Sequence, residues 1–550
     1  MKKFEWKAPG TTLSLLILTA VTLGCLLPFI AKALHIDDPF YFWCARHLVS
    51  NPFDFYGFKV NWEGQEASMS MVNRSPPLAA YYMALIGVLF GWSEVVLHGG
   101  FLLPALAVVI GTFFLARRFC SHPLWAALTT VAAPGFLLSS TSIMCDTMML
   151  GFWVWSVYFW IEGIETMSTP KLCLAALLIA ACSLTKYFGL SLIPLLLTYS
   201  LWKQRRMGLW IACLALPVIV FAFYQWLSCR LYGHGLFANA VAEAVNLRVG
   251  GGPASKILAG LAFSGGCMII LLPAAPLMLG RRGLAAGAAV LLLIGLLVVT
   301  MKKVGSFSII EDAGTVKWLF VAQFSLFAAA GFGLLFLAAA DLLERKTPAS
   351  GLLFLWILGA FVFACIVNWT VSGRNILPMI PAASLLLIRR LEARQSLRGR
   401  HDLRVWGAPL GVSLVIALLV TRADYVSADS ARSAASFLVQ RLGAVSNRIG
   451  FEGHWGFQYY MERLGARALD RQDLRLVGNE AIVVPLGNSY LFPLPEDRVV
   501  PWFLYKVQAS KWVTAMNASS GAGFYSDGWG PLPYVFCSVP AEEYYVCRVK

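Results

Sequence analysis

The sequence predicts a polytopic α-helical membrane protein with a small extracytoplasmic α/β domain at its C-terminal end. Of its 550 residues, 58% are apolar and only 13% are charged, whereas about a quarter of the residues in a soluble domain are charged. The apolar residues form blocks of roughly 20, the length that crosses a bilayer core as a helix. After residue 421 these blocks give way to a mixed polar texture, which predicts a separate soluble domain.

The membrane domain is predicted over residues 1–421, in the inner (plasma) membrane. Short basic clusters, such as Arg117 with Arg118, separate the apolar blocks and mark cytoplasmic loops by the positive-inside rule. This rule puts the N-terminus in the cytoplasm and the C-terminal domain outside. The thirteen predicted spans are 11–31, 98–116, 123–144, 147–163, 171–185, 187–202, 209–228, 258–279, 283–300, 317–340, 351–371, 375–389 and 404–421.

The apolar stretch 77–90 is interpreted as a short or partly inserted helix. A full crossing there would put Arg117 and Arg118 outside, against the charge rule. If this stretch does not cross the membrane, the first loop (32–75), the junction at Asp146, Arg374 and the whole tail lie on the same extracytoplasmic side. The loops 229–257 and 301–316 also lie on this side.

The tail, residues 422–550, has the pattern of a small α/β domain. Helical periodicity covers 428–445 and 456–464, and strands are predicted over 447–451 and 481–485. Cys537 and Cys547 are predicted disulfide partners if this domain faces an oxidising compartment. The run 453–460, rich in aromatic residues, is expected to pack against the membrane domain.

Several function classes receive no support from the sequence. Basic residues sit in short clusters between apolar blocks and form no single face, so no nucleic-acid partner is predicted. The phosphate-binding and dinucleotide-binding glycine motifs are missing, so no nucleotide cofactor is expected. The twelve cysteines show no metal-ligand spacing.

Two adjacent acids, Asp37 and Asp38, follow the first predicted span. Adjacent carboxylates repel each other, so a divalent cation, a basic partner or a proton taken from an acceptor would stabilise the pair. The structural alternative is that an Asp before Pro39 caps a helix over 40–49. Capping accounts for one acid but not for both, and the sequence leaves the two interpretations open.

A third acid, Asp146, lies between two apolar blocks after the Ser- and Thr-rich run 139–142. An ionisable group that borders hydrocarbon is costly, which favours a functional role. The alternative is a cap for the helix that begins at Thr147. If the chain folds Asp37 and Asp146 together, their carboxylates are candidates to bind a divalent metal ion or to orient an acceptor hydroxyl.

Three basic residues on the same side are candidate anion ligands: Arg74, Lys186 and Arg374. Lys186 lies between two apolar blocks, where an unpaired ammonium is costly and the phosphate of a lipid-linked substrate would stabilise it. For Lys186 and Arg374 the alternative is snorkelling toward lipid headgroups. Aromatic residues also crowd the first loop, and we expect an interfacial belt for most of them, although sugars stack on such rings too.

In their order along residues 10–390, these motifs resemble the GT-C superfamily of polyprenol-dependent glycosyltransferases. The most similar group contains the protein O-mannosyltransferases and the lipid A aminoarabinose transferase. The motifs are Asp37-Asp38 with Tyr41 and Ala45, Arg74-Ser75-Pro76-Pro77-Leu78 before Tyr81-Tyr82, Asp146, Thr185-Lys186-Tyr187, and the weaker Arg374-Asn375-Ile376-Leu377-Pro378.

The resemblance implies a role for each matching residue. Asp37 and Asp38 would be catalytic, with Asp37 as general base or acceptor-orienting group, and Asp146 would be the second acid, holding a divalent ion together with Asp37. Arg74, Lys186 and Arg374 would bind the donor phosphate. Three positions depart from the family: Asp38 replaces a common Glu, Arg74 a Lys, which keeps the charge but changes its geometry, and Asn375 a Tyr.

The implied reaction is a single displacement at the anomeric carbon of a polyprenyl-phosphate sugar, with inversion. The acceptor would be a lipid, a glycan or a protein, and the lipid tail of the donor would lie among membrane lipids in a groove between helices. Two other classes remain: a transporter or flippase of a lipid-linked saccharide, and a noncatalytic cell-envelope assembly protein. The candidate charges cluster at one surface and show no repeated halves, which favours the enzyme.

Overall fold

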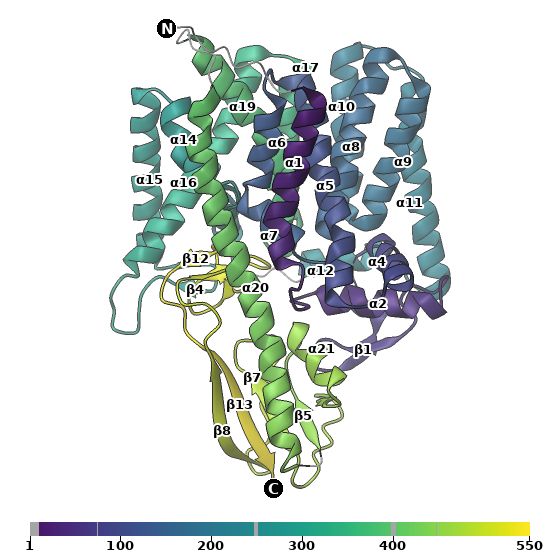
Figure 1. The fold of residues 1–550 in the computed structure, drawn as a ribbon, viewed down its shortest axis with the longest axis vertical. Coiled ribbons are helices and arrows are strands. Elements are labelled where there is room, and N and C mark those ends of the chain that lie inside the picture. Colours follow the sequence, from purple (N-terminus) through teal and green to yellow (C-terminus); the bar gives the residue numbers. More distant parts are fainter. Residues whose placement is uncertain (1–9, 74, 247–250, 398–402, 447) are drawn as a thin grey trace.

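The computed structural model describes residues 10–73, 75–246, 251–397, 403–446 and 448–550. It is a helical bundle with a strand-containing C-terminal part beyond one end, and the long helix α20 runs through both (Figure 1). The predicted fold class, a polytopic helical membrane protein with strands near its C-terminus, is confirmed.

Within the described residues, seven helices are long and apolar enough to cross a membrane, and two bent helix pairs raise the number to nine. One bend, of 62°, falls where Pro134 begins a new helix, since proline cannot continue the hydrogen-bond ladder. The seven are α1 with η1 (Thr11–Phe29), α5 (Glu94–Phe119), α11 (Trp210–Tyr232), α15 (Arg281–Met301), α16 (Trp318–Arg345), α17 with η3 (Pro348–Val367) and α20 (Gly407–Gly443). The bent pairs are α6 (Pro123–Val131) with α7 (Pro134–Ser140), and α13 (Pro253–Cys267) with α14 (Leu271–Met278).

The other four predicted spans are also helices, but they are short or interrupted by charge. Helices α9 and α10 have 17 and 13 residues. Helix α8 carries acids near both ends, and α19 carries several charges in its second half. Figure 1 shows α8, α9 and α10 running beside one another within the bundle. Their bounds are α8 (Cys145–Thr166), α9 (Thr169–Thr185), η2 (Tyr187–Ser191), α10 (Leu192–Gln204) and α19 (Ile380–Leu397).

The stretch 77–90 forms α4 (Leu78–Phe90), which ends at Gly91 with φ 103°. Thirteen residues span about 20 Å, less than the roughly 30 Å of a bilayer core, which confirms the prediction of a short helix. Other short elements lie at the same end of the bundle, with α2 near α4 and β4 on the other side of α20 (Figure 1). They include α2 (Asp38–Ser50), β1 (Lys59–Asn61), β2 (Glu66–Ser68), α3 (Met69–Val72), α12 (Leu236–Asn246) and the hairpin of β3 (Lys303–Val304) with β4 (Phe307–Ser308).

The C-terminal part contains a five-stranded mixed sheet in the order β6-β5-β7-β13-β8. The predicted strands appear as β5 and β7, and the predicted second helix appears as α21. Strand β5 pairs in parallel with β6 and β7, and β13 pairs antiparallel with β7 and β8. The bounds are β5 (Ile449–Phe451), α21 (Trp455–Arg463), β6 (Arg467–Ala468), β7 (Ala481–Pro485), β8 (Val499–Val507) and β13 (Glu542–Val549). Two ribbons precede β13: β9 (Val513–Thr514) with β12 (Val535–Phe536), and β10 (Met516–Asn517) with β11 (Ala522–Gly523).

The junction between the two parts is one continuous helix. The predicted boundary between 1–421 and 422–550 falls inside α20, and the helix predicted over 428–445 is the second half of α20. Helix α21 packs against the membrane part as expected: a Cβ at Gly456 would lie 2.0 Å from the carbonyl oxygen of Leu34. Tyr460 also accepts a hydrogen bond from the Leu34 N–H at 2.8 Å.

The predicted disulfide is wrong, because both cysteines are free thiols. Cys547 is fully buried in a small apolar cluster on one face of the sheet, with Ile482 and Leu469. Cys537 is partly buried against the main core instead. The two side chains therefore belong to different apolar clusters, and two cysteines in a polar tail were not sufficient evidence for a bond.

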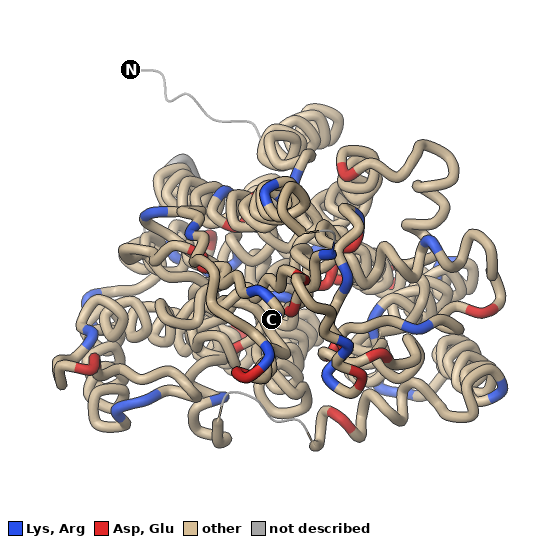
Figure 2. Tube along the Cα trace, turned by 90° about the horizontal axis from the view of Figure 1, so that it is seen from below, with Lys and Arg blue, Asp and Glu red and all other residues tan. Residues whose placement is uncertain are grey.

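Charged residues of both signs are distributed over the end that carries the C-terminus. Seen from that end, Lys and Arg are interspersed with Asp and Glu (Figure 2). Nucleic-acid-binding surfaces are dominated by basic residues. The basic excess behind the net charge of +15 is thus not gathered on this end.

A buried acid in the C-terminal sheet gives a testable dependence of stability on pH. Glu452 accepts a hydrogen bond from the Phe492 N–H at 3.1 Å, and burial raises its pKa from 4.5 to about 7. Folding therefore favours the protonated carboxyl, and the stability it contributes is present below pH 4.5 and is lost as the pH rises through 7. Glu452→Gln should raise the melting temperature at pH 8 and leave it nearly unchanged at pH 5. The exposed Glu496→Gln is the control, and equal pH dependence in wild type and Glu452→Gln would contradict the assignment.

Candidate active site

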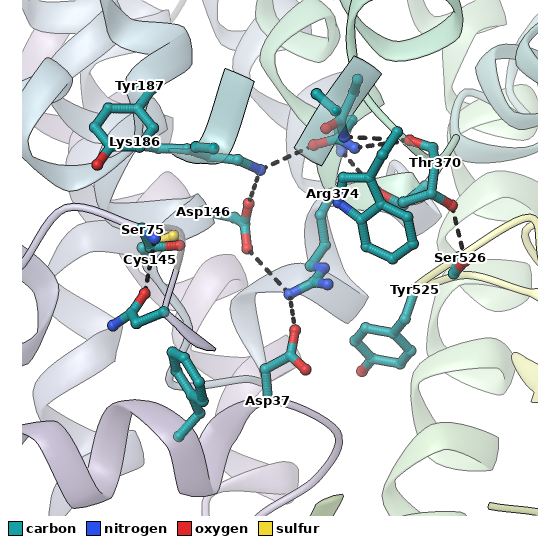
Figure 3. Close-up of a pocket in the computed structure, with 18 of the residues that line it drawn as sticks. Asp37, Ser75, Cys145, Asp146, Lys186, Tyr187, Thr370, Arg374, Tyr525 and Ser526 are labelled. Carbon is teal, nitrogen blue, oxygen red and sulfur yellow. Dashed lines mark hydrogen bonds and ion pairs between the residues drawn. The ribbon is translucent and has the colours of Figure 1, made fainter. Parts of the chain in front are cut away.

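A cavity of about 690 Å³ lies at the end of the bundle that faces the C-terminal part. This volume is within the range of small-molecule sites, about 300–1,000 Å³. Segments distant in the sequence form its walls, and Figure 3 shows several of their side chains pointing toward one another. The lining comes from the start of α2, the β1–β2 hairpin, the start of α8, η2, α12, the segment 363–375, the start of α21 and the tail segments 489–490 and 516–529.

Four predicted site residues form one ion-pair network in this cavity (Figure 3). Arg374 Nη1 lies 2.8 Å from Asp37 Oδ2 and 4.0 Å from Asp146 Oδ2. Lys186 Nζ lies 2.6 Å from the other oxygen of Asp146. Two carboxylates and two cations therefore alternate along the network, and their formal charges cancel.

The local structure explains why both acids are available. Asp37 is the N-cap residue of α2, but its side chain makes no capping hydrogen bond and reaches Arg374 instead. Asp146 lies in the first turn of α8, where the free N–H groups and the helix dipole stabilise a carboxylate. Its Oδ2 atom is buried and accepts no hydrogen bond among the described residues. Neither carboxylate is therefore occupied as a helix cap, and both take part in the ion-pair network.

Lys186 reaches the cavity because the chain changes direction at this residue. It is the extended residue between α9 and η2, with φ −152° and ψ 134°. Its Nζ donates to Asp146 Oδ1 and, at 2.9 Å, to Asn375 Oδ1. The side chain points into a polar site and does not snorkel toward headgroups.

The tail holds in place the segment that carries Arg374. The Gly373 N–H donates to the Phe524 carbonyl at 2.7 Å, and Asp527 Oδ1 accepts from the Val371 N–H at 2.9 Å. A Cβ at Gly373 would lie 2.2 Å from the Phe524 ring, so only glycine fits this approach.

The aromatic ring of Tyr525 completes the surroundings of Arg374. The guanidinium carbon lies 5.5 Å from the ring centroid, a cation–π geometry. Although burial lowers the pKa of Arg374, the carboxylates of Asp37 and Asp146 raise it well above its usual range. Arg374 therefore remains a fixed positive charge between the two acids.

The structure separates Asp38 from the other predicted catalytic residues. Asp38 is fully buried and does not line the cavity. Its two oxygens accept from the backbone N–H groups of His35 and Ile143, each at 3.0 Å. Burial raises the Asp38 pKa to about 6. The geometry therefore supports a positioning role, in which Asp38 ties the start of α2 to the turn before α8.

Arg74, the remaining predicted phosphate ligand, lies outside the described residues. Its neighbours Asn73 and Ser75 line the cavity. The Ser75 hydroxyl accepts a hydrogen bond from the Tyr41 hydroxyl at 3.2 Å, and the Ser75 carbonyl accepts from the Tyr56 hydroxyl at 2.7 Å. The residues on either side of Arg74 therefore line the same cavity as the ion-pair network.

The residues present do not fit the predicted divalent ion on Asp37 and Asp146. Hard cations prefer six or more oxygen ligands, yet no group of three or more His, Cys, Asp or Glu suited to a metal occurs among the described residues. The Arg374 guanidinium already lies between the two carboxylates, and the Lys186 ammonium contacts one of them. A further cation there would be repelled by both charges.

Sequence reasoning missed the contribution of the tail to the cavity. Trp455, Tyr525, Ser526 and Trp529 all line it, although the tail carries no motif of the resembled family. The stretch 521–533 combines four glycines with aromatic residues, Gly-Ala-Gly-Phe-Tyr-Ser-Asp-Gly-Trp-Gly-Pro-Leu-Pro. This composition is unusual for a surface loop, and it could have indicated that the tail contributes to the site.

The comparisons with known proteins agree with the motifs. Residues 74–229 match the family described as dolichyl-phosphate-mannose-protein mannosyltransferase. None of the curated protein sequences matches the chain.

Several solved structures are similar at low identity. The apo oligosaccharyltransferase of Archaeoglobus fulgidus has 13% identity and a TM-score of 0.46, over 85% of this chain and 64% of that one. ArnT from Cupriavidus metallidurans bound to undecaprenyl phosphate has 14% identity and a TM-score of 0.44, over 86% and 93%. The chain thus spans just under two thirds of the length of the archaeal protein. The family match confirms, over residues 74–229, the resemblance to the protein O-mannosyltransferase group of GT-C glycosyltransferases that the sequence motifs indicated.

Proposed function

We propose that this protein is a membrane glycosyltransferase that moves a sugar from a polyprenyl-phosphate donor to an extracytoplasmic acceptor, with inversion. The observation that carries the proposal is the network of two acids and two fixed cations in one cavity at an end of the helical bundle. We assign this end to the extracytoplasmic side and the N-terminus to the cytoplasm, as the basic clusters predict.

The donor would occupy the cavity with its phosphate at Lys186 and Arg374. Arg74 stays a predicted ligand from the sequence. Charge-assisted hydrogen bonds from an ammonium and a guanidinium suit phosphate oxygens. The wall beyond Lys186 is apolar, formed by Phe237 and Val241 of α12 together with Phe363. This wall supports a path for the polyprenyl chain toward the surface of the bundle.

In the reaction, an acceptor hydroxyl would attack the anomeric carbon of the donor sugar. The bond from this carbon to the phosphate oxygen breaks, and the polyprenyl phosphate leaves with the electron pair. Asp37, whose side chain is 31% exposed, takes the acceptor proton as general base. Lys186 and Arg374 stabilise the negative charge of the leaving group, and Asp146 holds both cations in place.

Release of polyprenyl phosphate by purified protein tests this function, and Lys186 provides its most direct variant. A charge-assisted hydrogen bond contributes about 1.5–3 kcal/mol, so Lys186→Met should raise the KM for the donor roughly 10- to 100-fold. Lys186→Arg should recover part of the loss. The control is Lys171→Met, which removes a lysine at the opposite end of the same helix, where it pairs with Glu162 at 2.6 Å.

Two results would contradict the proposal. If wild-type protein releases no polyprenyl phosphate from any donor in a panel, with a native membrane extract supplied as acceptor, the enzyme assignment fails. Movement of a labelled lipid-linked saccharide across vesicles without release would establish the transporter alternative. Equal donor KM values for wild type and Lys186→Met would contradict the assignment of Lys186 as a ligand of the donor phosphate.

A further inference from the structure

The wall of the cavity on the side of the tail is built from tryptophan rings. Trp62, Trp455 and Trp529 all line it and are half-buried. They come from the β1–β2 hairpin, the start of α21 and the loop after β11. The Trp455 and Trp529 ring centroids lie 5.1 Å apart, with the rings inclined at 61°. Three separate segments thus place large apolar faces around one open space.

Two aromatic residues in this wall are held in backbone conformations that bulky side chains rarely adopt. Trp455 has φ 63° and Tyr490 has φ 54°, and such residues typically cost about 1–3 kcal/mol. Hydrogen bonds tie the two segments that carry them together: Asn488 Oδ1 accepts from the His454 N–H at 2.8 Å, and Asn488 Nδ2 donates to the His454 carbonyl at 3.2 Å. Strain of this kind persists where a site requires it.

Polar groups accompany the rings on this wall, whereas the residues that α12 contributes to the cavity are apolar. Ser489, Ser526 and Glu63 line the cavity beside the tryptophans, whereas α12 contributes Phe237, Ala240, Val241 and Ala244. Aromatic faces with hydroxyl and carboxylate groups at their edges match a pyranose, whose C–H face is apolar and whose rim carries hydroxyls. The buried Ser489 Oγ has no hydrogen-bond partner among the described residues, and a lipid chain beside it would leave it unsatisfied.

The tryptophan wall also leads to water. Tyr490 is 50% exposed and lines the cavity, and it belongs to the C-terminal part, beyond the end of the bundle. A second substrate can therefore enter from the aqueous side while the apolar wall of α12 is occupied by a polyprenyl chain.

We propose that Trp62, Trp455 and Trp529 form the acceptor subsite, and that the acceptor is a carbohydrate. The inference rests on the proposed function and narrows its acceptor to a glycan. A sugar ring stacked there places one hydroxyl toward Asp37. The oxygen of this hydroxyl bonds to the anomeric carbon, its proton passes to Asp37, and polyprenyl phosphate leaves with the electron pair.

The test separates acceptor binding from donor turnover. The acceptor panel contains neutral oligosaccharides of two to six glucose, mannose, galactose or N-acetylglucosamine units, delipidated glycans from native membranes, and Ser/Thr peptides. Trp529→Ala should raise the KM for the glycan acceptor about tenfold, with the donor KM within twofold of wild type, and Trp529→Phe should retain most of the affinity. Trp512→Ala is the matched control, because this tail tryptophan is 76% exposed and does not line the cavity.

Each outcome distinguishes this inference from the proposed function. The protein could bind saccharides, more weakly in Trp529→Ala, and yet release no polyprenyl phosphate. This result would support the acceptor subsite and contradict the transferase function. Donor-dependent transfer only to peptides, or transfer to glycans with equal KM in wild type and Trp529→Ala, would overturn the subsite and retain the transferase. Absence of binding to every saccharide in the panel also overturns the subsite.

Discussion

Asp37→Asn is expected to lower the kcat for sugar transfer by roughly 10²–10⁴-fold, the range that a positioned general base contributes. Asparagine keeps an oxygen that can accept from Arg374, so the ion-pair segment stays in place, but it cannot take the acceptor proton. The donor KM should change by less than the kcat, because we assign Asp37 to the acceptor proton and Lys186 and Arg374 to the donor phosphate. Initial rates of transfer at saturating donor and acceptor give the comparison.

The control for this variant is Asp473→Asn, which neutralises an exposed acid on the C-terminal part, 58% exposed in its side chain. Both proteins should show the same melting temperature within error. A kcat for Asp37→Asn above one tenth of the wild-type value would exclude Asp37 as the base. Asp146 would then be the only other acid of the network, although it is almost fully buried and held by Lys186.

The sequence predicted much of the site because its polar residues stand at the ends of helices. Asp37 precedes α2, Asp146 begins α8, and Lys186 follows α9. An acid or a lysine between two apolar blocks is costly in a membrane protein, so each was visible without a structure. The positive-inside rule then put them on one side, and the structure brings them within 4 Å of a neighbour in one network.

The remaining features depend on contacts between distant segments, which local patterns do not encode. Asp37 and Asp38 are chemically equivalent in the sequence, and only the fold directs one to Arg374 and the other to the N–H of Ile143. Tyr525 of the tail contacts Arg374, although the two residues lie 151 positions apart in the sequence. Helical periodicity predicted the second half of α20 but not its continuity with the last span, because the boundary at 421 was placed where the apolar block ends.

A buried ion pair that the sequence did not single out joins the membrane part to the tail. Lys32 follows the first span and is completely buried, and its Nζ lies 2.5 Å from Oδ2 of the equally buried Asp424 in α20. The Tyr525 hydroxyl donates to the same oxygen at 2.9 Å, and His35 Nε2 lies 3.4 Å from the other. The ring of Tyr525 packs against Arg374, so this cluster helps to hold Arg374 in the candidate active site.

Removing one partner of such a pair leaves an uncompensated charge in the interior, which typically costs about 3–5 kcal/mol. Lys32→Met should therefore lower the free energy of unfolding in detergent by that amount and reduce transfer as Arg374 loses its support. The double variant Lys32→Met/Asp424→Asn removes the buried charge while the amide oxygen still accepts from Tyr525, so most of the lost stability should be recovered.

Lys59→Met is the matched control, because Lys59 pairs with Glu66 at 3.5 Å on the surface, where such pairs contribute about 0–1 kcal/mol. A Lys32→Met protein as stable as Lys59→Met would show that the charge of Asp424 is compensated by His35 or by water, and the cluster would then not be the support that fixes Arg374.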